Sequence, residues 1–193
     1  QDASPNAFAT GRTPEHSYVV VTSGLLKELD KRELTGVIAH EMSHIANYDI
    51  RVSMIVFGLV SAIGLISDIL LRTAFGAGRS DDDDSGSPYI YIVMIIVAIL
   101  SPIIAAMIQL AVSRQREYLA DSSAALLTRD PEGLIMALQK LDRSARPLQR
   151  QNTATAHMYI VNPLKKGLLN RLFSTHPSID DRIARLKKIG GQM

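Results

Sequence analysis

The sequence predicts a mostly helical α+β fold with a small sheet, interrupted by a two-helix hydrophobic hairpin. Three observations predict it. Apolar residues recur at helical spacing over positions 34–45, beside two histidines. β-branched residues are concentrated in a short run at 18–22. Residues 89–112 form a run of 24 uncharged positions, and about 20 are enough to cross a bilayer.

The N-terminal elements follow from local patterns. Residues 6–10 and 18–22 read as two strands, and the turn at Ser23-Gly24 leads into a short helix over 25–29. Asp30 and Glu33 have the spacing of a capping box, which starts the next helix.

Two apolar segments come next. Residues 89–112 are predicted to span a membrane. Residues 52–67 form a shorter uncharged run, which extends to Leu71 only if the charged residue Asp68 is included, and this segment is predicted to span as well. Between them, residues 76–88 are polar and rich in Gly and Ser. Their four consecutive aspartates lack the EF-hand spacing, so we interpret them as a solvated loop.

Three parts of the chain are therefore expected: 1–50 and 113–193 as the two halves of a water-exposed catalytic domain, and 51–112 as a transmembrane hairpin. In the second half, Asp130 caps a helix with proline at its first position. The expected elements of this half are a helix at 113–121, a helix at 131–141, a mildly strand-like stretch at 149–161, and helices at 163–173 and 177–189.

Residues 40–44 read HEMSH, an HExxH motif on the capped helix. His40 and His44 lie one turn apart on one helix face, so both imidazoles can reach one metal ion. Glu41 lies to the side, where it can act as a general base. A zinc ion at such a site lowers the pKa of a bound water to about 7, which prepares the water for attack on a carbonyl group.

A catalytic zinc site needs a third protein ligand. The chain has no cysteine, so the candidates are His16, His157, His176 or a carboxylate. Glu117 is the best of these, because it lies one helical turn from Asp121, which could orient a ligand imidazole. The alternative is an exposed Arg-Glu pair on a helix surface, and His16 and His157 are expected to be ordinary surface histidines.

The motifs together resemble a known family. The stretches at 6–11, 40–49, 113–121 and 175–177 are similar, in order, to those of the HtpX-type membrane zinc metallopeptidases, which are related to CaaX prenyl proteases and Oma-type peptidases. The resemblance implies a gluzincin-type endopeptidase that degrades misfolded or damaged membrane proteins in stress response and protein quality control. It implies one zinc ion on His40, His44 and Glu117, with Glu41 as base.

The same resemblance implies protein substrates and a lipid bilayer as partners. Members of this family usually begin with two further hydrophobic helices, whereas this chain starts at Gln1, so we interpret it as a truncated or processed chain. Two alternatives remain: an intramembrane protease with Asp68 as third ligand, since an ionisable residue in an apolar run is suspect for function, and a non-catalytic binding module that keeps the fold.

Three further features are candidates for binding or catalysis. The strand at Asn6, Ala7 and Phe8 could pair with an extended substrate, or be an ordinary edge strand. His176 could donate to the oxyanion of a tetrahedral intermediate, or cap the helix that follows. Arg182 could assist His176, or pair with one of the neighbouring aspartates at 180 and 181.

Orientation follows from parity and charge. The two histidines precede the first apolar segment and Glu117 follows the second, so both segments cross the membrane or neither does. Arg51, Arg114 and Arg116 flank the catalytic side, which favours a cytoplasmic catalytic domain on the inner or plasma membrane. The net charge of +2 argues neither for nor against a nucleic-acid partner. No basic-aromatic pattern suggests one, so none is predicted.

Overall fold

The computed structural model describes residues 2–11, 13–77, 88–144 and 176–192. The predicted strand-like stretch at 149–161, the helix at 163–173, His157 and the aspartates of the connector lie outside these residues. The elements in order are β1 (Ala7–Gly11), the 3-10 helix η1 (Pro14–His16), β2 (Ser17–Val21), α1 (Ser23–Glu28), α2 (Lys31–Ala46), α3 (Asp49–Ala77), α4 (Pro88–Thr128), α5 (Pro131–Ser144) and α7 (Ile179–Gly190).

The mostly helical α+β class with a small sheet is confirmed. The chain divides into two compact units, one of residues 1–51 and 113–193 and the other of residues 52–112. Each unit is described by itself below.

The sheet of the first unit consists of β1 and β2, which pair antiparallel with Ala7 opposite Val21 and Gly11 opposite Ser17. The side chain of Thr22 extends this pairing, since its hydroxyl accepts the Asn6 N–H at 2.9 Å and also caps α1. The two strands are each shifted by one residue from the predicted ranges.

Helix α2 begins as the sequence predicts. The Asp30 carboxylate accepts the Glu33 N–H at 2.9 Å, and the Glu33 carboxylate accepts the Asp30 N–H at 2.8 Å, so the capping box is confirmed. The Glu33 carboxylate also binds the ammonium group of Lys140 on α5 at 2.7 Å. This ion pair therefore ties the first turn of α2 to α5 and helps to position the HEMSH motif farther along α2.

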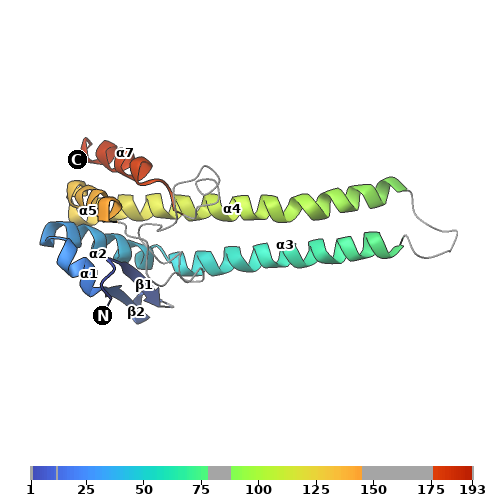
Figure 1. Cartoon of the computed structure of the whole chain (residues 1–193), viewed down its shortest axis with the longest axis horizontal. Helices are drawn as coiled ribbons and strands as arrows, with labels where there is room; N and C mark the ends of the chain where they lie inside the picture. Colours follow the sequence, from blue (N-terminus) through green and yellow to red (C-terminus); the bar gives the residue numbers. More distant parts are fainter. Residues whose placement is uncertain (1, 12, 78–87, 145–175, 193) are drawn as a thin grey trace. The chain divides into compact units, whose positions relative to one another are not determined.

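The core of the first unit lies where α5 packs between α2 and α7 (Figure 1). Apolar residues at helical spacing on these three helices are fully buried. They include Val37 of α2, Leu134, Ile135 and Leu138 of α5, and Leu186 of α7. Because α5 packs against both α2 and α7, these two helices share one apolar core.

Helix α4 is longer than either element predicted for its sequence. It runs for 41 residues and contains both the apolar stretch 89–112 and the stretch 113–121, which the sequence predicts as separate parts. The composition changes at position 113, but no glycine or proline follows there to end a helix. Predicted helix ends elsewhere also moved: α5 continues to Ser144, and α7 starts at Ile179 with Ser178 as its N-cap.

The second unit buries small side chains and exposes large apolar ones. Its buried residues are small, namely Ser67 and Ala74 on α3 and Ala98 and Ala105 on α4. Each pair is seven residues apart, so its members share one helix face. Large apolar side chains such as Phe57 are exposed instead. Within the described residues two helices, Asp49–Gly76 and Tyr89–Thr128, are long and apolar enough to cross a membrane.

Candidate metal centre

Three residues from two helices converge in the first unit. His40 and His44 come from α2 and Glu117 from α4, and their possible ligand atoms all lie within 4.8 Å of one another. The two Nε2 atoms are 3.1 Å apart. The Glu117 carboxylate is 3.5 Å from Nε2 of His44 through Oε1 and 3.7 Å from Nε2 of His40 through Oε2.

These separations fit a tetrahedral metal. Zinc binds imidazole nitrogen and carboxylate oxygen at about 2.0–2.2 Å, so two ligands of a tetrahedral site lie about 3.3–3.6 Å apart. The three separations of 3.1, 3.5 and 3.7 Å surround this range. Two imidazoles and one carboxylate are also a ligand set that zinc commonly takes in catalytic sites.

The charges around this point fit a divalent cation as well. Four carboxylates are buried here: Glu41, Asp49, Glu117 and Asp121. Within the described residues, the guanidinium groups of Arg182 and Arg116 form ion pairs with this group. With neutral imidazoles, these six groups carry a net charge of −2. Buried charges need partners, and a divalent metal would neutralise this charge.

Glu41 lies beside the two histidines without belonging to the ligand cluster. It is buried, and burial raises its pKa above the ordinary value, although the nearby histidines and the Ala9 N–H, which the carboxylate accepts, act in the opposite direction. The hydrogen bond to Ala9 shows that β1 passes alongside Glu41. A buried carboxylate with a raised pKa is suited to accepting and returning a proton near neutral pH.

Glu117 is surrounded by donors. Burial alone would raise its pKa, but the hydrogen bond from His176 and the charge of Arg182 outweigh burial and hold the pKa well below the ordinary value. Nδ1 of His176 is 3.3 Å from Oε2 of Glu117, and Nη1 of Arg182 is 3.4 Å from the same oxygen. Glu117 is therefore ionised, as a metal ligand must be.

His40 is held from its other side by Asp121. Oδ1 of Asp121 is 3.0 Å from Nδ1 of His40. The guanidinium group of Arg182 binds both oxygens of Asp121, at 2.8 Å from Nε and 2.7 Å from Nη2. Burial raises the pKa of Asp121, but Arg182 and His40 outweigh it and bring the pKa to about 2.

Arg182 does not pair with the aspartates next to it in sequence, so that alternative is wrong. Its side chain is only 1% exposed and points into the unit, because it lies on the face of α7 that also carries buried Leu186. The aspartates at 180 and 181 lie on the exposed face. His176 does not cap α7 either, since the Ser178 hydroxyl accepts the Asp181 N–H there.

The other histidine also has a carboxylate partner, Asp49, which the sequence motifs did not indicate. Oδ2 of Asp49 is 2.5 Å from Nδ1 of His44. Burial lowers the pKa of His44, but the Asp49 hydrogen bond and the neighbouring carboxylates outweigh it, and the pKa is raised. Spacing gave no signal for this contact, because Asp49 lies five residues after His44, beyond the end of α2.

Other candidate residues lie as follows. Asp68 belongs to the second unit and pairs with Arg72, one turn along α3, at 2.7 Å. His16 is exposed on η1 and contacts the Thr13 hydroxyl at 3.1 Å. In the strand region, Asn6 and Ala7 are buried and Phe8 is half-buried.

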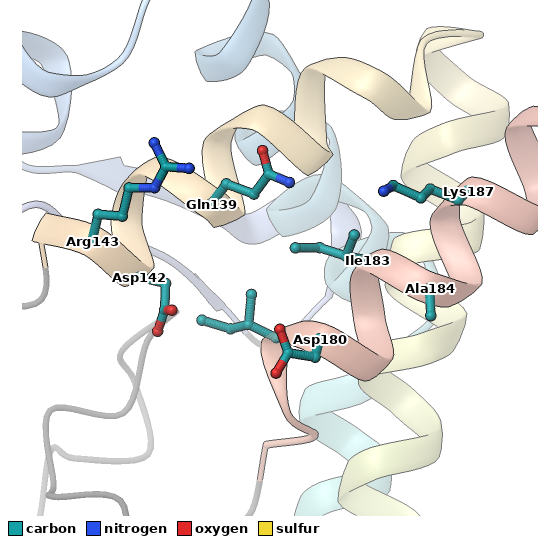
Figure 2. Close-up of a pocket in the computed structure, with 8 residues that line it drawn as sticks. Gln139, Asp142, Arg143, Asp180, Ile183, Ala184 and Lys187 are labelled. Carbon is teal, nitrogen blue, oxygen red and sulfur yellow. The ribbon is translucent and has the colours of Figure 1, made fainter.

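A separate groove of about 460 Å³ lies between α5 and α7 (Figure 2). Its lining includes the apolar residues Ile183 and Ala184 and charged side chains such as those of Arg143 and Asp180. No residue of the metal cluster lines it. The groove is thus not where the catalytic groups converge.

Comparison with known proteins gives the family. Residues 1–190 match Peptidase family M48, and the chain belongs to this family. Relatives named "Protease HtpX homolog" include one from Tropheryma whipplei (strain Twist), 55% identical over 192 residues and covering 99% of this chain. Another from Dictyoglomus thermophilum is 52% identical over 189 residues and covers 98% of it.

The chain spans only part of those relatives, namely 65% of the Tropheryma protein and 61% of the Dictyoglomus protein. Among solved structures, S. mikatae Ste24p matches 95% of this chain and 42% of its own, with a TM-score of 0.56 and 22% sequence identity. At this identity the match concerns the fold alone.

Proposed function

We propose that this chain is the catalytic part of a membrane-anchored zinc endopeptidase that hydrolyses misfolded or damaged membrane proteins. The observation that carries the proposal is the convergence of His40, His44 and Glu117 within 4.8 Å, with Glu41 beside them. Membership of Peptidase family M48 supports peptide hydrolysis as the reaction. The substrate class is taken from the motifs that resemble HtpX-type peptidases.

The three convergent residues would hold one zinc ion per chain. Zinc would lower the pKa of a water molecule and polarise the carbonyl group that is attacked. The chain's own contribution is to keep the donor atoms deprotonated and fixed. Asp121 accepts the N–H of His40 at Nδ1, which leaves Nε2 of His40 as the ligand atom, and Arg182 fixes Asp121 in turn.

Glu41 would act as the general base and then the general acid. Its carboxylate takes a proton from the attacking water and returns it to the amine leaving group when the peptide bond breaks. The raised pKa caused by burial makes the carboxylate a better proton acceptor. The Ala9 N–H fixes the carboxylate, so the base and the strand β1 keep a constant spacing.

The edge of β1 that faces away from β2 would bind the substrate. β1 pairs with β2 along one edge, and its other side approaches α2, where the Ala9 N–H reaches Glu41. An extended peptide added there would make main-chain hydrogen bonds without demanding particular side chains. The stretch of Asn6, Ala7 and Phe8 is therefore the proposed substrate-binding strand, with the buried Asn6 and Ala7 side chains serving the fold. Because the N–H and the C=O of Asn6 are both bonded to Thr22, the main-chain pairing would begin at Ala7.

His176 is the proposed donor to the oxyanion. Its place against Glu117 puts an imidazole next to the ligand cluster, where negative charge develops on the attacked carbonyl oxygen. Arg182 is better suited to positioning than to catalysis, because its guanidinium group is occupied by Asp121 and Glu117. Replacement of His176 by Ala should lower kcat while zinc stays bound.

The second unit would anchor the enzyme. We assign 51–112 to a transmembrane hairpin and 1–50 with 113–193 to the catalytic domain, and the exposed apolar side chains of α3 and α4 support this assignment. Arg51, Arg114 and Arg116 favour a cytoplasmic catalytic domain on the inner or plasma membrane. Of the alternatives, a ligand role for Asp68 has less support, since Asp68 forms an ion pair with Arg72 and the group of His40, His44 and Glu117 already supplies three ligands.

Zinc content and peptidase activity test the proposal together. Protein purified in detergent should contain one zinc per chain by mass spectrometry, and should cleave casein until a chelator is added. Zinc-free protein that cleaves casein, or a zinc-loaded chain that cleaves nothing, would overturn it. Membrane anchoring is tested separately: residues 89–112 should resist protease in liposomes, and a detergent-free soluble monomer would contradict the hairpin assignment.

A further inference from the structure

Asp49 makes two different contacts with its two carboxylate oxygens. Oδ2 lies 2.5 Å from Nδ1 of His44, and Oδ1 lies 3.2 Å from Nε of Arg116. The Asp49 side chain is buried, and that of Arg116 is 21% exposed. A buried carboxylate with an imidazole on one oxygen and a guanidinium on the other is fixed in position.

A backbone turn brings Asp49 to this place. α2 ends at Ala46, and Tyr48 then takes a left-handed conformation with a φ of 55°. This turn redirects the chain, so that α3 begins at Asp49 with its side chain directed back at His44. A non-glycine residue in this region is energetically unfavourable, and such residues are concentrated at functional sites.

The contact determines which nitrogen of His44 can bind a metal. A neutral imidazole has one N–H and one lone pair. With the N–H donated from Nδ1 to Asp49, the lone pair is on Nε2, the atom that lies 3.1 Å from Nε2 of His40 and 3.5 Å from Glu117. Metal-ligating histidines commonly donate their other nitrogen to a carboxylate in this way.

The arrangement matches the one on the other histidine. His40 contacts Asp121, which is held by Arg182, and His44 contacts Asp49, which is held by Arg116. Arg116 precedes Glu117 by one residue, so α4 provides both a ligand and the arginine behind a second ligand. We propose that Asp49 and Arg116 are positioning residues for His44, with Arg116 acting through Asp49.

This inference rests on the proposed zinc site. It predicts that Asp49 and Arg116 set the affinity for zinc, not only the stability of the fold. The probe is zinc itself, titrated against a chromophoric chelator with the whole chain in detergent. The variants are Asp49→Asn, Arg116→Gln, Arg116→Lys and the double variant Asp49→Asn with Arg116→Gln, and Arg114→Gln is the matched control on the same helix.

Asp49→Asn should weaken zinc binding by about 10- to 100-fold, as expected when such a partner of a ligand is lost. Arg116→Gln should weaken it by a smaller factor, Arg116→Lys should restore part of the loss by retaining the charge, and Arg114→Gln should change nothing. Because Arg116 acts through Asp49, the double variant should bind zinc no more weakly than Asp49→Asn alone.

Thermal unfolding of the zinc-free protein separates positioning from folding. If the variants lower the unfolding temperature of the zinc-free and zinc-loaded protein equally while the zinc affinity stays at the wild-type value, the pair is merely structural and the inference is wrong. If the losses of zinc affinity from the two single substitutions were additive in the double variant, Arg116 would not act through Asp49. A wild-type protein that does not bind zinc would instead overturn the proposed function, and this inference with it.

Discussion

The two units of the chain bury opposite kinds of side chain. The first unit buries four carboxylates and an arginine around the candidate metal centre, next to an apolar core. The second buries small residues such as Ala98 and Ala105 and exposes isoleucine, leucine and phenylalanine. Buried charges need partners, whereas large apolar side chains exposed along two whole helices are typical of surfaces that face an apolar partner or a membrane. The difference is what the proposed membrane anchoring of the second unit would explain.

The same pair of residue types illustrates the difference. Arg182 and Asp121 are joined by two hydrogen bonds and both are buried. Arg72 and Asp68 form an ion pair of similar length, one turn apart on α3, with both side chains largely exposed. The first pair belongs to a network that reaches His40 and Glu117. The second pair belongs to the other unit.

The largest expected difference is between two substitutions that each remove a carboxylate, one in each unit. Glu117→Ala removes one of three protein ligands, so zinc occupancy and peptidase activity should both collapse. Asp68→Asn should leave both near the wild-type values. Zinc stoichiometry and peptidase rate, measured side by side for the two variants, check this expectation. Full zinc occupancy in Glu117→Ala with zinc lost from Asp68→Asn would move the site into the apolar unit.

A smaller loss is expected where the metal site stays intact. Glu41→Gln keeps the shape of the side chain but cannot accept a proton, and Glu41 is not among the convergent ligand atoms. Zinc should therefore remain bound, while the peptidase rate falls by about 10²- to 10⁴-fold. Metal analysis and casein cleavage on one preparation check the retained zinc and the lowered rate. Turnover near the wild-type rate would exclude Glu41 as the base.

The sequence was sufficient for local features of the first unit. It predicted the capping box of α2, the HEMSH turn and the two strands, because short-range spacing and propensity determine them. It could not pair Arg182 with Asp121, since 61 residues separate them and packing of α7 brings them together. It also missed Asp49, whose contact with His44 depends on the left-handed turn at Tyr48.

Breaking the two Arg-Asp pairs compares the units directly. Arg182→Ala leaves two buried carboxylates, Asp121 and Glu117, without their guanidinium partner. Loss of one member of a buried ion pair costs about 3–5 kcal/mol, so the free energy of unfolding of the zinc-free protein should fall by that amount. Arg72→Ala should leave it nearly unchanged. Equal unfolding midpoints for the two variants in detergent would show that the buried network contributes little.

The smallest effect tests helix packing with one substitution made twice. At Gly36 of α2 an added Cβ would lie 2.7 Å from the backbone nitrogen of Leu134 on α5, whereas at Gly58 of α3 nothing lies within 4 Å of it. Alanine is favoured over glycine in a helix by about 1 kcal/mol, which should make Gly58→Ala neutral or slightly stabilising.

At Gly36 the overlap with α5 should outweigh that gain, because backbone atoms cannot move aside like a flexible side chain. The expected net loss for Gly36→Ala is about 1–3 kcal/mol, as for other overpacked sites. Unfolding in denaturant, followed by helical circular dichroism in the same detergent, measures both variants. If Gly36→Ala were as stable as Gly58→Ala, the close approach of α2 and α5 would not be what positions the two histidines.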